Sequence, residues 1–130
     1  MNNQEIYLSV IIPARNEEKR IGRTIDAIYS YLKKQAYNSE IIVCDNGSTD
    51  KTRATVEEKM KTIANLKIIE LKVPGKGGTV KQGMLEAKGK IRLFTDADNS
   101  TDISHFDKMR SFFDKGYEVV ICSRHPWDAL

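Results

Sequence analysis

The sequence predicts an α/β fold with a mostly parallel sheet and helices on both faces. Three observations support this. Short β-branched apolar runs alternate with amphipathic segments, polar clusters directly follow several of these runs, and 130 residues suffice for one hydrophobic core. We therefore expect a single domain over residues 1–130.

The first strand and helix are predicted in the N-terminal third of the chain. Leu8–Ile12 is a β-branched run that ends at Pro13, a pattern typical of a strand buried on both faces. A helix is predicted over 17–34, because apolar residues recur there every three or four positions. These residues are Ile21, Ile25, Ile28 and Leu32.

The same alternation continues to the end of the chain. A helix through Ala54 and Met60 is predicted with Ser48 or Thr49 as its cap. The other predicted helices are 80–87, opened by the glycine-rich loop "VPGKGGTVKQG", and 102–115. Further strands are predicted at 40–44, 66–71, 91–95 and 117–122.

Composition excludes several classes of protein. Lys plus Arg outnumber Asp plus Glu by 21 to 18, so the net charge of +3 gives no reason to expect a nucleic-acid partner. No signal peptide and no apolar run of about 20 residues is present, and a cytoplasmic location is expected. Cys44 and Cys122 lie in apolar runs and are expected to be buried free thiols.

The acidic stretch "FTDADNSTD", residues 94–102, follows a predicted strand. If the strand stays extended, Asp96 and Asp98 point the same way and can hold Mg²⁺, Mn²⁺ or Ca²⁺. An EF-hand loop is the competing reading, but Thr101 stands where that loop needs glycine, and a strand precedes it. The alternatives are thus a metal–phosphate site and a solvated acidic turn.

Two other clusters follow predicted strands. Gly75, Lys76 and the next two glycines can offer N–H groups and a cation to a phosphate, although their spacing matches neither a P-loop nor a dinucleotide-binding motif. A mobile surface turn is the alternative there. The residues 45–48 can equally be a turn and a helix cap. Ligands bind at the carboxyl ends of parallel strands, so we expect residues 13–17, 45–48 and 96–98 to converge on one edge.

Taken in order, "SVIIPARNEE", "EIIVCDNGSTDKT", "GKGGTVKQGM" and "FTDADNSTD" resemble the family 2 inverting glycosyltransferases, which have the GT-A fold. The resemblance covers essentially the whole chain. It is closest to the branch that charges polyprenyl phosphates, the dolichyl-phosphate glucosyltransferases and mannosyltransferases. It implies a Rossmann-like GT-A nucleotide-sugar-binding fold.

The resemblance also assigns nucleotide-sugar contacts in the first half of the chain. The residues that match the first nucleotide-contacting loop are Pro13, Ala14, Asn16 and Glu17. Asp45 and Asn46 match an acidic pair whose second member meets the base. Here the chain departs from the family, because Asn46 stands where aspartate is usual; an amide can still pair with uracil.

In the second half, Lys76 matches the loop over the diphosphate. Asp96 and Asp98 match the D-x-D motif, which implies a Mg²⁺ or Mn²⁺ cofactor and places both residues at the metal. Asp98 and Arg124 are the implied catalytic residues. Arg124 lies in "CSR", where Cys122 replaces the glycine of a "GSR"-like segment.

The implied activity is transfer of a hexose from a nucleoside diphosphate sugar, UDP-glucose being favoured, to an acceptor, a polyprenyl phosphate, with inversion. The alternatives are a non-catalytic nucleotide-sugar-binding module and a family 2 transferase that acts on a saccharide hydroxyl. A sugar nucleotidyltransferase ranks last, because "PARNEEKRIG" lacks its glycine-rich loop. Family members run well beyond this length, so we expect a C-terminal truncation. Membrane contact at the cytoplasmic face is expected through the missing region.

Overall fold

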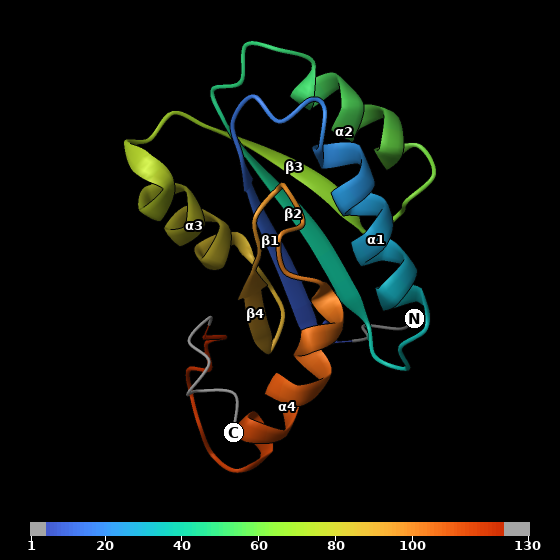
Figure 1. Ribbon diagram of the computed structural model, residues 1–130, viewed down its shortest axis with the longest axis vertical. Coiled ribbons are helices and arrows are strands. Elements are labelled where there is room, and N and C mark those ends of the chain that lie inside the picture. Colours follow the sequence, from blue (N-terminus) through green and yellow to red (C-terminus); the bar gives the residue numbers. More distant parts are fainter. Residues whose placement is uncertain (1–4, 124–130) are drawn as a thin grey trace.

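The computed structural model describes residues 5–123, which form a four-stranded sheet with helices packed against it (Figure 1). The strand order is β3-β2-β1-β4, and every neighbouring pair runs parallel. The predicted parallel sheet is therefore confirmed. The strands are β1 (Leu8–Ala14), β2 (Ser39–Asn46), β3 (Leu66–Leu71) and β4 (Ile91–Phe94).

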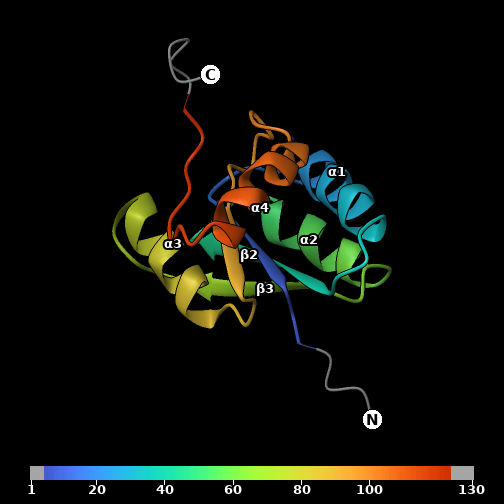
Figure 2. The same ribbon diagram turned by 90° about the horizontal axis from the view of Figure 1, so that it is seen from below.

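Helices cover both faces of the sheet, as predicted (Figure 2). One face carries α3, and the other carries α1, α2 and the start of α4. The helices are α1 (Ile21–Lys33), α2 (Thr52–Met60), α3 (Gly75–Glu86) and α4 (Phe106–Asp114), the last preceded by a short 3₁₀ turn at Ile103–His105. None of the helices within residues 5–123 is long and apolar enough to cross a lipid bilayer.

Strand β1 is apolar along its length because it is buried on both sides. Val10 and Ile12 pack into the core under α1, whereas Ile11 packs with β2 under α3. This is the two-residue alternation of a strand placed between two helical layers. The parallel register sets Ala14 opposite Asp45. The loops after β1 and β2 consequently leave the sheet at the same edge.

The starts of three helices differ clearly from the predictions, among them α4, which begins at Phe106 rather than at Asp102 because a 3₁₀ turn comes first. Helix α3 begins at Gly75, so the glycine-rich stretch that was predicted to be a loop forms the first turns of the helix. Helix α1 begins at Ile21 rather than at Glu17, because hydrogen bonds from the Arg20 and Ile21 amides to the Glu17 carbonyl make a separate turn. The polar loop after β1 is therefore longer than the periodicity indicates.

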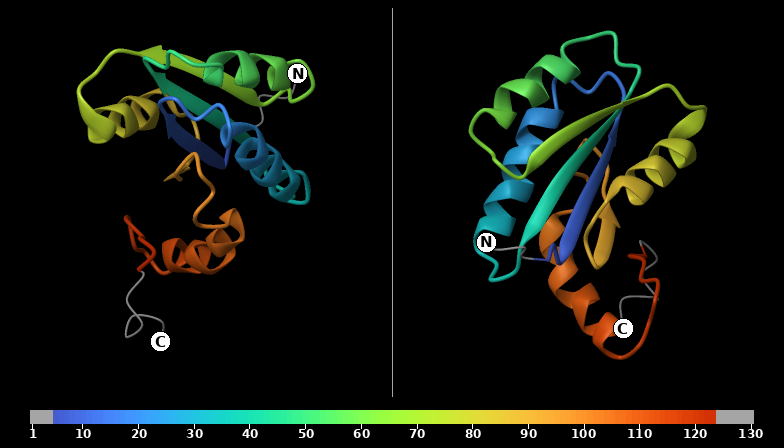
Figure 3. Two further views of the ribbon diagram at one scale, coloured as in Figure 1. Left: turned by 45° about the horizontal axis from the view of Figure 1, so that its top comes forward. Right: turned by 180° about the vertical axis from the view of Figure 1, so that it is seen from behind.

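The prediction of a fifth strand at 117–122 is wrong. This segment runs past β4 without joining the sheet (Figure 3). Val119 and Ile121 are 80% and 82% exposed. A pocket of about 580 Å³, mostly apolar, lies between β4, α4 and the segment 118–122. Cys44 is buried as predicted, but Cys122 is exposed, because it lies in this unpaired segment.

A buried carboxylate holds together the edge of the sheet opposite the polar loops. Glu40 is only 5% exposed, and it accepts hydrogen bonds from the Ser9 hydroxyl at 2.6 Å and the Lys88 amide at 2.7 Å. Lys67 lies 3.1 Å from its other oxygen. Burial alone would raise the pKa of Glu40, but these three partners outweigh it and hold the pKa below its usual value.

This network predicts an acid-sensitive fold. A carboxyl whose folded-state pKa is lowered stabilises the protein above its unfolded pKa, and that contribution is lost as the pH falls through the lowered folded-state pKa. Glu40→Gln should lower the free energy of unfolding at pH 7 by about 2 kcal/mol, because a charged acceptor is replaced by a neutral one. Urea unfolding of both proteins at pH 7 and pH 4 measures this. An equal loss at both pH values would contradict the assignment.

Candidate functional site

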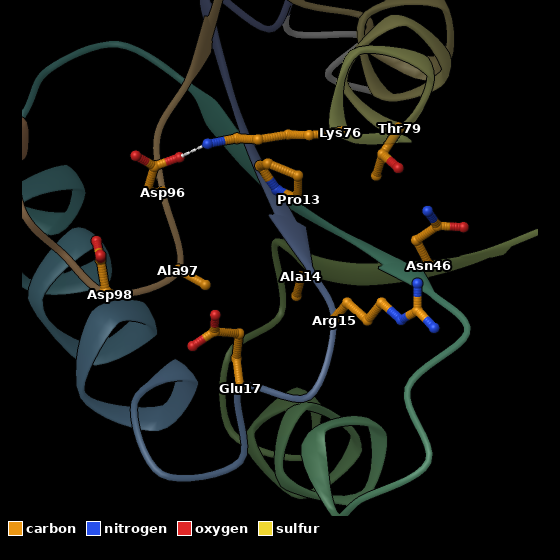
Figure 4. Close-up of a pocket in the computed structure, with 10 residues that line it drawn as sticks. All are labelled: Pro13, Ala14, Arg15, Glu17, Asn46, Lys76, Thr79, Asp96, Ala97 and Asp98. Atoms are coloured by element: carbon orange, nitrogen blue, oxygen red, sulfur yellow. Dashed lines mark hydrogen bonds and ion pairs between the residues drawn. The ribbon is translucent and has the colours of Figure 1, made fainter. Parts of the chain in front are cut away.

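A pocket of about 290 Å³ lies where the polar loops converge, at the carboxyl ends of β1, β2 and β4 (Figure 4). This is the edge at which parallel sheets bind ligands. The convergence predicted from the sequence is thus confirmed for most of the clusters. The residues that line the pocket are Pro13, Ala14, Arg15, Glu17, Asn46, Lys76, Thr79, Asp96, Ala97 and Asp98.

The two aspartates after β4 are positioned by the buried residue between them. Strand β4 ends at Phe94, and a turn follows over Ala97 and Asp98, so the extended geometry expected through Asp98 is not kept. The Ala97 side chain is buried, and its carbonyl accepts a 2.5 Å hydrogen bond from the Thr24 hydroxyl of α1. Anchoring this central residue leaves both flanking carboxylates on the pocket wall.

Each carboxylate has a polar partner close by. Asp98 accepts a hydrogen bond from the Ser100 amide at 3.0 Å, which holds the pKa of Asp98 below its usual value. Asp96 forms an ion pair with Lys76, which extends across the pocket from α3 (Figure 4). A cation therefore already lies against Asp96.

The donor set suits a divalent cation held jointly with a phosphate ligand. Asp96 and Asp98 offer the carboxylate oxygens that Mg²⁺ and Mn²⁺ prefer, and no Cys or His lines the pocket. Within residues 5–123, no group of three His, Cys, Asp or Glu side chains is arranged to enclose a metal ion. The protein alone would thus leave coordination positions to diphosphate oxygens and water.

Reciprocal hydrogen bonds join the loops after β1 and β2. The backbone amide of Asn16 donates to the Ser48 hydroxyl at 2.9 Å, and the side-chain Oδ1 of Asn16 accepts from the backbone amide of Thr49 at 2.8 Å. The Glu17 amide donates to the Thr52 hydroxyl at 2.7 Å, at the start of α2. The backbone of Asn16 is left-handed, with φ of 53°. This residue shapes the loop and does not line the pocket.

Asp45 and Asn46 turn in different directions at the end of β2. Asp45 is buried and accepts a 3.2 Å hydrogen bond from the Ser48 amide, so it stabilises the turn and does not line the pocket. Asn46 does line the pocket, but its amide group is hydrogen-bonded to the backbone of Val73. The remaining predicted residue, Arg124, lies outside the described residues.

Three residues that line the pocket were not predicted as site residues. Arg15 belongs to the polar cluster after β1, and its charge and position were a usable signal. Thr79 is buried, and its hydroxyl donates to the Gly75 carbonyl at 3.1 Å, one turn earlier in α3. Its place was hidden because the glycine-rich stretch was read as a loop. Ala97 carries no chemical signal, since its role is to be small and buried.

Comparison with known proteins is consistent with this site. Residues 9–129 match the family described as glycosyl transferase family 2. The dolichyl-phosphate beta-glucosyltransferase of Dictyostelium discoideum is 36% identical over 118 residues, which are 85% of this chain and 36% of that protein. The chain spans about a third of the length of the curated relatives it matches.

Solved structures give the same result for the fold. Staphylococcus aureus TarS 1-349 in complex with UDP-GlcNAc superimposes with a TM-score of 0.60 at 30% identity, covering 85% of this chain and 32% of that one. The Pyrobaculum calidifontis mannosyltransferase PcManGT, in complex with GDP-Man and Mn²⁺, superimposes with a TM-score of 0.63 at 30% identity. The superposition covers 74% of this chain and 28% of that one. The GT-A fold is confirmed. This chain belongs to glycosyl transferase family 2.

Proposed function

We propose that this chain is the donor-binding part of a metal-dependent hexosyltransferase, which moves a sugar from a nucleoside diphosphate sugar to a polyprenyl phosphate with inversion. The observation that carries the proposal is the meeting of Lys76, Asp96 and Asp98 in one pocket at the carboxyl edge of the sheet. UDP-glucose is the favoured donor, since the matched relatives are named dolichyl-phosphate beta-glucosyltransferases. Mn²⁺ in the PcManGT complex supports a divalent cation.

The pocket's own residues have distinct roles in this proposal. Lys76, in the first turn of α3, binds the diphosphate, together with the free amides at the start of that helix. Asp96 and Asp98 hold Mg²⁺ or Mn²⁺, which neutralises the charge that develops on the leaving diphosphate. Arg15 adds a second positive charge to the pocket. A phosphate acceptor is already ionised near neutral pH, so it needs positioning rather than a general base.

Calorimetric titration of the chain with UDP-glucose, with Mn²⁺ and with EDTA, tests the proposal. We expect binding that is about tenfold tighter with Mn²⁺, because Asp96 and Asp98 would hold a divalent cation whose positive charge attracts the diphosphate. GDP-mannose titrated alongside should bind more weakly if UDP-glucose is the donor. Absence of binding to both donors with Mn²⁺ present would overturn the proposal.

A further inference from the structure

The side chain of Asn46 makes two hydrogen bonds to the backbone of Val73, in the way that one strand of a sheet pairs with the next. Its Nδ2 donates to the Val73 carbonyl at 2.9 Å, and its Oδ1 accepts from the Val73 amide at 3.0 Å. The backbone ladder between β2 and β3 ends at Asn46 opposite Leu71. The amide thus extends the pairing beyond the last strand residues. Aspartate cannot do this, because an ionised carboxylate has no donor.

Val73 is the link between this amide and the helix that lines the pocket. It precedes Pro74, the N-cap of α3, and Gly75, whose backbone is left-handed with φ of 73°. The Val73 side chain also packs in the first turn, since its Cγ2 would lie 3.5 Å from a Cβ on Gly78. The position of Val73 therefore fixes where α3 begins.

The start of α3 carries the groups that face the diphosphate in the proposed function. Lys76 lies in this first turn and reaches Asp96, on the far side of the pocket (Figure 4). Asn46 is hydrogen-bonded to Val73, and Val73 lies three residues before Lys76 in the chain. We propose that Asn46 is a positioning residue that orients the first turn of α3 toward the diphosphate, rather than a residue that reads the nucleobase. This inference rests on the proposed function.

The two roles differ in how a mutation affects different ligands. Asn46→Ala removes both hydrogen bonds to Val73 without adding a charge to the pocket. A positioning role predicts that UDP, GDP and inorganic pyrophosphate, each with Mn²⁺, lose affinity by the same factor, about tenfold. A base-reading role predicts a loss for UDP alone. Hydrogen exchange at the Val73 amide should also become about tenfold faster in the unliganded variant, because its hydrogen-bond acceptor has been removed.

Asn65→Ala is the matched control. The Asn65 Nδ2 donates to the Ser39 carbonyl at 3.2 Å, at the other end of β2, so the variant makes the same substitution and loses the same kind of bond away from the pocket. Its three affinities should equal those of the wild type. An unchanged pyrophosphate affinity in Asn46→Ala, or unchanged exchange at Val73, would overturn the inference. A wild-type chain that binds none of the three ligands would overturn the proposed function itself.

Discussion

Replacing Gly83 with alanine is expected to lower the free energy of unfolding by about 3 kcal/mol. Gly83 lies in α3, where the helix packs on the sheet. A Cβ at this position would lie 2.5 Å from Cγ2 of Ile11 and 2.7 Å from Sγ of Cys44. Both neighbours are fully buried in the sheet, so neither can move aside without disturbing the core. Urea unfolding of the unliganded protein measures the difference.

Gly77→Ala, in the same helix, is the control. No atom lies within 4 Å of a Cβ on Gly77, so alanine there should raise stability by about 0.5–1 kcal/mol, through its better helix propensity. Opposite signs for the two variants would show that close packing, and not glycine content, sets the cost at Gly83. Equal effects would contradict this explanation.

The pattern of the strands could be predicted because each strand carries its own signal. The third strand has the predicted bounds, Leu66–Leu71, and the ends of the other three strands that form differ from the predicted ends by at most two residues. The start of α3 was missed because glycine usually indicates a loop. At Gly83 a side chain would clash with the sheet, so glycine is needed there for the helix to pack closely on the sheet. Such a requirement depends on residues far away in the sequence, which local composition does not contain.

The missing fifth strand has a different physical cause. A β-branched run predicts a strand only when a neighbour supplies backbone hydrogen bonds. Residues 117–122 have the composition of a strand, but no strand among the described residues pairs with them. The segment therefore has the residue preferences of a strand but no neighbouring strand to pair with, and the apolar side chains of Val119 and Ile121 remain exposed.

The candidate site was predicted in position but not in every contact. The rule that ligands lie at the carboxyl ends of parallel strands correctly placed residues of the stretches 13–17, 45–48 and 96–98 around one pocket. It did not distinguish residues that face the pocket from residues that hold its loops. Asn16 and Asp45 belong to the second group, because their partners are amides of the loop 47–51. Such pairings become visible only once the chain is folded.

Asp98→Asn is expected to weaken binding of the Mn²⁺ complex of UDP by about 100-fold, because one of the two carboxylates available to the cation loses its charge. Asparagine can still accept the hydrogen bond from the Ser100 amide, so the turn should keep its shape. Binding of UDP in EDTA should not weaken, since the substitution removes a negative charge from beside the diphosphate. Calorimetry under both conditions separates the two effects.

Asp102→Asn is the control within the same acidic stretch. The Asp102 carboxylate accepts from the Ser104 hydroxyl at 2.9 Å and does not line this pocket, so its removal should leave both affinities unchanged. A general effect of negative charge near the site would weaken metal-dependent binding in both variants alike. Loss in Asp98→Asn alone identifies a specific ligand to the cation, and equal losses would contradict the assignment of Asp98.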